Sequence, residues 1–188
     1  MTDQELIEKA KQIKALVLDG DGVFFAGTVL LDPKKGEAYK ERSHIDGQGI
    51  SLLRAIGIQV ALVSGEKTGF MEKADEKLNN LPAVKAGKWP PIGIFTGPQG
   101  SDKVTAVAGW LKTIGVSWAQ CAGMGDDLAD YQFLKKVGLA AAPSQAEPII
   151  KNICHFIAGR KGGQGAIRDL ANFILEVRGI DVLTLDLR

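Results

Sequence analysis

The sequence predicts an α/β fold in which a parallel sheet lies between two layers of helices, a three-layer sandwich with a β-hairpin extension. Three short apolar runs, Ala15–Leu18, Ile58–Val63 and Trp118–Met124, have the composition of strands buried on both faces. Segments with apolar residues at helical spacing separate these runs. Strands that alternate with helices in this way are typical of a parallel sheet that helices cover on both sides.

The N-terminal part of the chain predicts a helix, a strand and a hairpin in that order. Thr2 and Glu5 fit a capping box at the start of a helix. After the strand at Ala15–Leu18, two β-rich stretches, Val23–Leu31 and Glu37–Ser43, flank a turn at Pro33–Gly36. Since turn residues join two strand-like stretches, we expect a hairpin over about residues 23–43.

The rest of the chain continues the alternation, apart from residues 79–100, where prolines and glycines break any regular pattern. Because no linker and no internal repeat interrupt the chain, residues 1–188 are expected to form a single domain. The expected helices are Gly49–Ile56, Thr68–Leu78 (Thr68 as cap), Ser101 or Asp102 to Ile114, Leu128–Val137, Ala146–Asn152 and Ala166–Val177; the further strands are Ile92–Phe95, Leu139–Ala142 and His155–Ala158.

Composition excludes several classes of partner. The 23 Lys and Arg residues nearly balance the 22 Asp and Glu residues, which argues against nucleic acid and membrane surfaces as partners. No apolar run reaches the roughly 20 residues that span a bilayer, and the charged segment Met1–Lys14 is not a signal peptide. Cys121 and Cys154 lie in apolar stretches without metal-type spacing, so we expect buried free thiols in a reducing compartment. The cytoplasm is the expected location.

Reactive side chains follow directly after three of the predicted buried strands. In an open parallel sheet, ligands bind beyond the carboxyl ends of the strands, so these side chains should meet in one crevice. Carboxylates gathered there repel one another unless a cation joins them, and a hard, oxygen-binding ion such as Mg²⁺ suits them. The side chains are Asp19 and Asp21, Ser64, and Asp126 with Asp127, together with Lys103 at the start of a helix.

This set of side chains suits phosphoryl transfer, which needs an in-line nucleophile and positive charge around the phosphoryl oxygens. Asp19 is the expected nucleophile, and Asp21 is the expected acid and base at the leaving oxygen. Mg²⁺ would be held by Asp19, Asp126 and the main-chain carbonyl of Asp21. Ser64 and the amides after it would bind a phosphoryl oxygen, and Lys103 would supply a positive charge.

The same residues resemble the four ordered motifs of the haloacid dehalogenase superfamily of phosphatases. The matching segments are Asp19-x-Asp21-Gly-Val, Ser64-Gly65, Lys103, and Gly125-Asp126-Asp127 with Asp130. The resemblance implies a Rossmann-like parallel sheet, a Mg²⁺ cofactor and an aspartyl-phosphate intermediate. Asp127 and Asp130 would support the site rather than bind the metal; Asp130 is expected to orient Lys103 or a helix end.

The spacing of the motifs leaves no room for a cap domain after the first or the second motif. The chain therefore resembles the capless branch that includes 3-deoxy-D-manno-octulosonate 8-phosphate and nonulosonate 9-phosphate phosphatases, which implies lipopolysaccharide or sialic acid synthesis as the context. Ile45–Ile50 and Gly162–Arg168 also resemble this branch. The resemblance implies that substrate contacts come from Asp46, Gly47, Gly65, Glu66 and Lys67. Glu66 stands where the octulosonate enzymes usually have Arg.

Without a cap, a single subunit leaves its site open to water. In the capless branch four subunits associate through the hairpins and cover one another's sites, so the resemblance implies a homotetramer. The hairpin here is expected to be apolar enough to need a partner. Its apolar residues are Val23, Phe24, Phe25, Val29, Leu30 and Leu31.

Other interpretations of the same residues stay open. Asp-Gly-Asp-Gly is good turn chemistry, Ser64, Asp126 and Asp127 suit helix caps, and Glu66 with Lys67 suits a solvated surface. The lead function is a Mg²⁺-dependent sugar-acid phosphate phosphatase with a small-molecule substrate. The alternatives are a phosphatase for another small phosphorylated metabolite, or a non-catalytic module that tetramerises a cytidylyltransferase.

Overall fold

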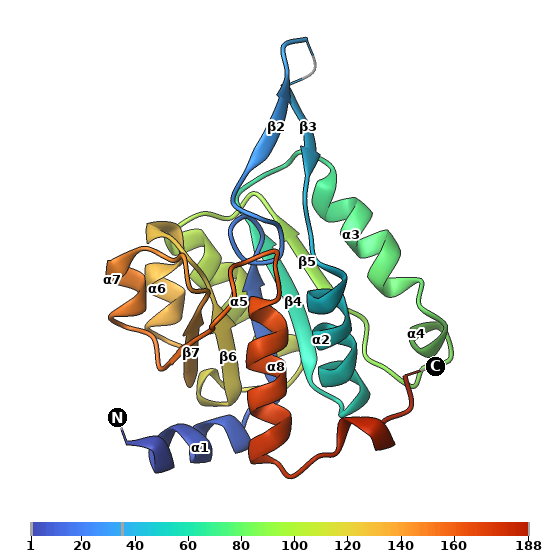
Figure 1. The fold of residues 1–188 in the computed structure, drawn as a ribbon, viewed down its shortest axis with the longest axis vertical. Helices are drawn as coiled ribbons and strands as arrows, with labels where there is room; N and C mark the ends of the chain where they lie inside the picture. Colours follow the sequence, from blue (N-terminus) through green and yellow to red (C-terminus); the bar gives the residue numbers. More distant parts are fainter. Residues whose placement is uncertain (1, 35, 188) are drawn as a thin grey trace.

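The computed structural model describes residues 2–34 and 36–187, and its centre is a parallel sheet of six strands. The strand order across the sheet is β5-β4-β1-β6-β7-β8, so β1 lies between β4 and β6 (Figure 1). The strands are β1 (Ala15–Asp19), β4 (Gln59–Ser64), β5 (Gly93–Thr96), β6 (Cys121–Met124), β7 (Leu139–Ala142) and β8 (Phe156–Ile157).

Helices pack on both faces of this sheet, which confirms the predicted three-layer sandwich. One face carries α1 (Asp3–Lys11), α2 (His44–Ala55), α3 (Phe70–Asn79) and α8 (Ala166–Val177). The other face carries α5 (Ser101–Thr113), α6 (Tyr131–Leu134) and α7 (Pro148–Lys151). The short helix α4 (Pro82–Lys85) and the 3-10 turns Trp118–Gln120, Leu128–Asp130 and Val182–Thr184 complete the described elements.

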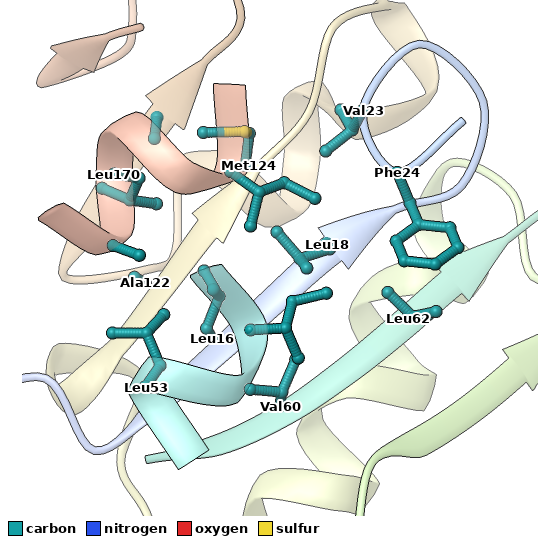
Figure 2. Packing of buried hydrophobic residues seen from close by; sticks show 14 of the residues in the cluster. Leu16, Leu18, Val23, Phe24, Leu53, Val60, Leu62, Ala122, Met124 and Leu170 are labelled. Atoms are coloured by element: carbon teal, nitrogen blue, oxygen red, sulfur yellow. The ribbon is translucent and has the colours of Figure 1, made fainter. Parts of the chain in front are cut away.

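Alternate residues of each strand point to opposite layers, because successive side chains of a strand leave opposite faces. Leu16 and Leu18 of β1 are fully buried and pack in the cluster that contains Leu53 of α2 and Leu170 of α8 (Figure 2). Val17 joins the cluster on the opposite face. Full burial stabilises each such aliphatic side chain by about 1.5–3 kcal/mol. The carboxyl ends of the central strands are therefore held rigidly.

The hairpin is shorter than the sequence predicted. Its strands are β2 (Val29–Asp32) and β3 (Gly36–Lys40), which project beyond the sandwich in Figure 1. Val23–Ala26 is a buried turn instead of a strand, because the amides of Phe24 and Phe25 donate to Gly20 O at 3.0 and 2.8 Å. Of the predicted apolar hairpin residues, only those of β2 are exposed. Lys35 of the predicted turn, like Met1 and Arg188, lies outside the described residues.

Several helix boundaries also differ from the predictions. α2 begins at His44 because Ser43 caps it, its side chain accepting from Ile45 N at 3.0 Å. Gly69, with φ +82°, caps α3 in place of Thr68. Gly100, not Ser101 or Asp102, precedes the first residue of α5. The start of the predicted strand Trp118–Met124 forms a 3-10 turn, and the predicted helix Leu128–Val137 is divided between a 3-10 turn and α6.

Residues 79–100, which broke the sequence pattern, are organised around a buried arginine. Arg54 of α2 is 0% exposed and donates to Pro90 O at 2.8 Å and to Leu78 O at 3.0 Å. Its guanidinium also lies 5.9 Å from the centre of the Trp89 ring, which is 5% exposed. Trp89 therefore packs within the fold. Among the residues described, no helix is long and apolar enough to cross a membrane.

Candidate active site

The strand order brings the predicted reactive residues into one pocket of about 410 Å³. β1, β4 and β6 are neighbours, and their carboxyl ends carry Asp19, Ser64 and Asp126. All of the predicted site residues line this pocket except three, which are Asp46, Gly47 and Lys67. The crevice expected beyond the strand ends is thus formed by side chains that lie far apart in the sequence.

The loop after β1 requires glycine where it approaches Asp126. Gly22 has φ +83°, and a Cβ atom at this position would lie 1.9 Å from Asp126 Oδ2. Gly20 is equally confined, since a Cβ atom there would lie 2.7 Å from Ser64 Cβ. A side chain at either position would displace a pocket residue. The two glycines therefore do more than form a turn, because they let the loop after β1 pack directly against Ser64 and Asp126.

Three carboxylates form a compact acidic cluster. One oxygen each of Asp19, Asp126 and Asp130 lies within 4.8 Å of the other two. Burial, followed by repulsion from Asp130, raises the pKa of Asp19 well above its usual range. Burial is the main cause that raises the pKa of Asp126 to about 7, and the negative charges of Asp130 and then Asp127 add to it. Buried, mutually repelling oxygens are the donor set that a hard divalent cation neutralises, so the residues fit Mg²⁺.

Lys103 is the cation already present in this cluster. It is 2% exposed, and its Nζ donates to Asp19 Oδ1 and, at 2.7 Å, to Asp130 Oδ1. Burial works to lower the pKa of Lys103, but the attraction of Asp19 and then of Asp130 outweighs it, and the pKa is raised. A lysine held between two carboxylates presents a fixed positive charge next to the expected nucleophile.

Asp130 accepts hydrogen bonds from Lys103 and from two backbone amides. While Oδ1 accepts from Lys103, Oδ2 accepts from the amide of Asp126 at 3.0 Å and from that of Asp127 at 3.4 Å. Both Asp130 oxygens therefore accept hydrogen bonds within the protein, whereas for Asp19 only Oδ1 accepts from Lys103. Asp127 caps the next turn, since its Oδ1 accepts from Leu128 N at 2.6 Å.

The opposite wall of the pocket comes from the end of β4. Ser64 is 2% exposed, and its Oγ accepts from the amide of Glu66 at 3.1 Å. Gln99 lines the same wall and packs against Gly65, where a Cβ atom would lie 2.5 Å from Gln99 Cγ. Gln99 was not among the predicted site residues, because it lies in the irregular segment before Lys103. Lys67 is exposed and lies beside Gly97, outside the pocket lining.

A second residue that the sequence analysis missed is Lys40, on strand β3 of the hairpin. Its Nζ donates to both carboxylate oxygens of Asp21, at 2.8 Å each. The sequence signal was weak, since a single lysine in a predicted hairpin strand is usually solvated. The contact with a pocket carboxylate follows only from the tertiary fold.

The structure does not bring Asp46 to the pocket, contrary to the substrate contact that the sequence resemblance implied. Asp46 is 0% exposed, and its two oxygens accept from the amides of Gly165 at 2.8 Å and of Arg168 at 3.1 Å. It thereby holds the glycine-rich loop at residues 159–165, in which the Gly163 amide donates to Val23 O at 2.8 Å. The buried Asp46 carboxylate therefore supports the loop after β1 indirectly, through the glycine-rich loop.

Gly47 also lies away from the acidic cluster. It lines a separate depression, together with Arg42 and Trp89. The two cysteines are both free, but only Cys121 is fully buried, while Cys154 is partly exposed. Burial raises the pKa of each thiol to about 12, so neither is a reactive thiolate.

Comparisons with known proteins show the family of the chain. The family model for haloacid dehalogenase-like hydrolases matches residues 9–168. The chain is 33% identical over 172 residues to the 3-deoxy-D-manno-octulosonate 8-phosphate phosphatase of Yersinia pestis, across 91% of this chain and 84% of that protein. A crystal structure of a phosphatase with this name, also from Yersinia pestis, is 30% identical with a TM-score of 0.81, and the match covers 93% of this chain and 87% of that one.

A third relative was solved with ligands. The structure of the 3-deoxy-D-manno-octulosonate 8-phosphate phosphatase from Moraxella catarrhalis contains a magnesium ion, a phosphate ion and a KDO molecule. It is 26% identical to this chain with a TM-score of 0.81, and the match covers 94% of this chain and 93% of that one. The likeness therefore extends over nearly the whole length of both chains.

Proposed function

This chain belongs to the haloacid dehalogenase-like hydrolase family, and from that premise we propose that it hydrolyses a sugar-acid phosphate with Mg²⁺ as cofactor and Asp19 as nucleophile. The observation that carries this proposal is the acidic cluster, in which oxygens of Asp19 and Asp126 lie within 4.8 Å of each other beside the buried Lys103. Within its family the chain is a phosphoric monoester hydrolase.

The side chains divide the reaction into two steps. In the first, an Asp19 oxygen bonds to phosphorus, the bond from phosphorus to the leaving oxygen breaks, and Asp21 gives that oxygen a proton. In the second, water bonds to phosphorus, the bond to Asp19 breaks, and Asp21 takes the proton of the water. Mg²⁺ held by Asp19, Asp126 and the Asp21 carbonyl would screen the anions and polarise the phosphoryl group.

The remaining pocket residues hold the phosphoryl group. Lys103 offers its charge beside Asp19, where it would stabilise the negative charge that is spread over the equatorial oxygens of the transferring group. Ser64 and the amides that follow it lie on the opposite wall and suit a phosphoryl oxygen. Together these groups favour a dianionic phosphate ester over a neutral substrate.

The substrate class is inferred from the names of the relatives and from the rim of the pocket. Two octulosonate 8-phosphate phosphatases align over nearly the whole chain. Glu66 lines the pocket, where a carboxylate accepts hydrogen bonds from sugar hydroxyls, whereas Arg prefers a carboxylate or a phosphate. We therefore propose a nonulosonate 9-phosphate alongside octulosonate 8-phosphate. A different small phosphorylated metabolite is the alternative.

Association through the hairpin is part of the same proposal. Leu30, Leu31 and Tyr39 are 69%, 70% and 71% exposed on the projecting hairpin. Apolar side chains this exposed favour burial against another subunit, and a tetramer would also cover the open pocket. Light scattering at micromolar concentration should give a mass above that of the monomer. A monomer under these conditions would contradict the association.

Phosphate release separates the enzyme from a non-catalytic assembly module. We expect turnover of an aryl phosphate with Mg²⁺ and none after chelation, because the acidic cluster needs a cation. A panel of phosphorylated sugar acids ranked by kcat/KM then identifies the substrate. Absence of Mg²⁺-dependent turnover on every member of the panel would favour the cytidylyltransferase-associated module.

A further inference from the structure

We propose that Lys40 is the positioning residue for Asp21, so that the hairpin sets the geometry of proton transfer at the pocket. The inference rests on the proposed phosphatase function and extends it to a residue outside the four motifs. The Lys40 side chain is 4% exposed, whereas the Asp21 side chain is 37% exposed. The lysine is therefore the more firmly held partner, and the carboxylate is the group that it holds.

Lys40 is fixed by contacts on several sides. Its Nζ lies 3.2 Å from Glu37 Oε2, a second ion pair within the hairpin. The same nitrogen lies 6.0 Å from the centre of the Phe25 ring and 5.6 Å from that of Phe70. Cations are attracted to aromatic faces at such distances. Pairing of Lys40 with Val29 across the hairpin fixes the backbone as well.

The Asp21 side chain has few restraints of its own, whereas its backbone forms a bridge with Phe25. It lies between Gly20 and Gly22 in the loop that follows β1. Within the described part of the chain, both hydrogen bonds to its carboxylate come from Lys40, at 2.8 Å each. Without that lysine, the half-exposed carboxylate would be free to rotate toward solvent. A displacement of about 1 Å of a reacting group can lower a rate by about 100-fold.

The proposed reaction uses Asp21 twice, and 4-nitrophenyl phosphate separates the two uses. Nitrophenolate leaves with the electron pair of the broken P–O bond and needs no proton, so phosphorylation of Asp19 proceeds without Asp21. Hydrolysis of the aspartyl-phosphate still requires Asp21 to take a proton from water. A misplaced Asp21 should therefore slow the second step far more than the first.

The first experiment is a rapid-mixing measurement with Lys40→Met and saturating Mg²⁺. We expect a burst of nitrophenolate approaching one equivalent per subunit at nearly the wild-type rate, followed by turnover slowed about 10- to 100-fold, since general acid–base groups contribute about 100- to 10,000-fold. Lys40→Arg should retain more turnover, because a guanidinium also pairs with both oxygens of a carboxylate. Lys34→Met, an exposed lysine of the same hairpin, should behave as the wild type.

A double-mutant cycle decides whether Lys40 acts through Asp21. Lys40→Met should slow the wild type as above but change turnover less than about twofold in an Asp21→Asn background, with each variant assayed well below its own thermal midpoint and at saturating Mg²⁺. Loss of the burst in Lys40→Met, or an equal slowing in the Asp21→Asn background, would overturn the inference while the wild type remains active. An inactive wild type would instead overturn the proposed function, and this inference with it.

Discussion

The acidic cluster and the rim of the pocket are built in different ways. The cluster gathers at the ends of adjacent strands β1 and β6 and at the start of α5, where Asp19, Lys103 and Asp130 are each at most 7% exposed. The rim includes Glu66, after β4, and Gln99, before α5, which are more exposed and lie outside regular secondary structure. Sheet topology thus fixes the positions of the reacting groups, while loops provide the residues that would contact the rest of the substrate.

From this contrast we expect the largest fall in kcat when Asp19, the proposed nucleophile in the cluster, is replaced. Asp19→Asn should lower kcat by about four orders of magnitude or more, because an amide is a poor nucleophile. Steady-state phosphate release with a coupled assay checks this, and Asp102→Asn, on the exposed side of α5, is the control. Near-normal turnover by Asp19→Asn would refute the assigned nucleophile.

Lys103 should be the next most sensitive position. Lys103→Met removes the cation between Asp19 and Asp130, so kcat should fall by about 100- to 1,000-fold. Loss of one partner of a buried ion pair also leaves uncompensated charge, which costs about 3–5 kcal/mol of unfolding free energy. Denaturant unfolding and phosphate release measure the two effects, with the exposed Lys112→Met as the control. A fully stable Lys103→Met would contradict the tight packing of charges described for the cluster.

The third prediction concerns Asp126, whose substitution should stabilise the metal-free protein. The folded-state pKa of Asp126, about 7, lies above the ordinary value of 3.8, so ionisation opposes folding. This cost is complete above pH 7 and disappears as the pH falls toward 4. Without Mg²⁺ at pH 8, Asp126→Asn should therefore raise the thermal midpoint by several degrees, at about 2–4 °C per kcal/mol.

With Mg²⁺ added, the wild-type protein should become more stable than Asp126→Asn. Wild-type protein should gain stability with the metal concentration, because a ligand that binds the folded state stabilises it, while Asp126→Asn should gain little. Thermal scans at pH 8 and pH 5, with and without Mg²⁺, compare the two proteins. Equal metal responses would show that Asp126 is not part of the metal site.

The smallest effects are expected at the rim. Glu66→Gln and Gln99→Ala should change kcat/KM for a phosphorylated sugar acid several-fold, because one hydrogen bond contributes about 0.5–1.5 kcal/mol. The same variants should leave turnover of 4-nitrophenyl phosphate within about twofold, since that substrate has no sugar to contact the rim. Equal losses on both substrates would place these residues in the chemistry of the cluster instead.

The sequence allowed much of the cluster to be predicted, because each group follows a buried strand directly. Asp19, Ser64 and Asp126 needed only the rule that ligands bind at the carboxyl ends of parallel strands. The fold class followed from the same alternation of strands and helices. The four motifs, in order, then indicated the family that the comparisons report.

The residues that were mispredicted depend on contacts that the local sequence pattern does not show. Phe24 and Phe25 have a strand-like pattern, yet their amides donate to Gly20 O, which turns the chain, and both side chains are buried. Asp46 lies in a segment that resembles a substrate loop, but its carboxylate faces the amides of Gly165 and Arg168. Lys40 and Asp21 are likewise brought together only by the tertiary fold. Local pattern does not encode such pairings.

The location of a bound metal would decide whether Asp19 and Asp126 share one ion. Crystals grown with Mn²⁺, which takes oxygen ligands as Mg²⁺ does, would reveal the ion by anomalous scattering. We expect one ion held by carboxylate oxygens of both Asp19 and Asp126, with the Asp21 carbonyl as a further ligand. An active protein whose ion lies elsewhere, or whose Asp19 and Asp126 share none at saturating metal, would contradict it.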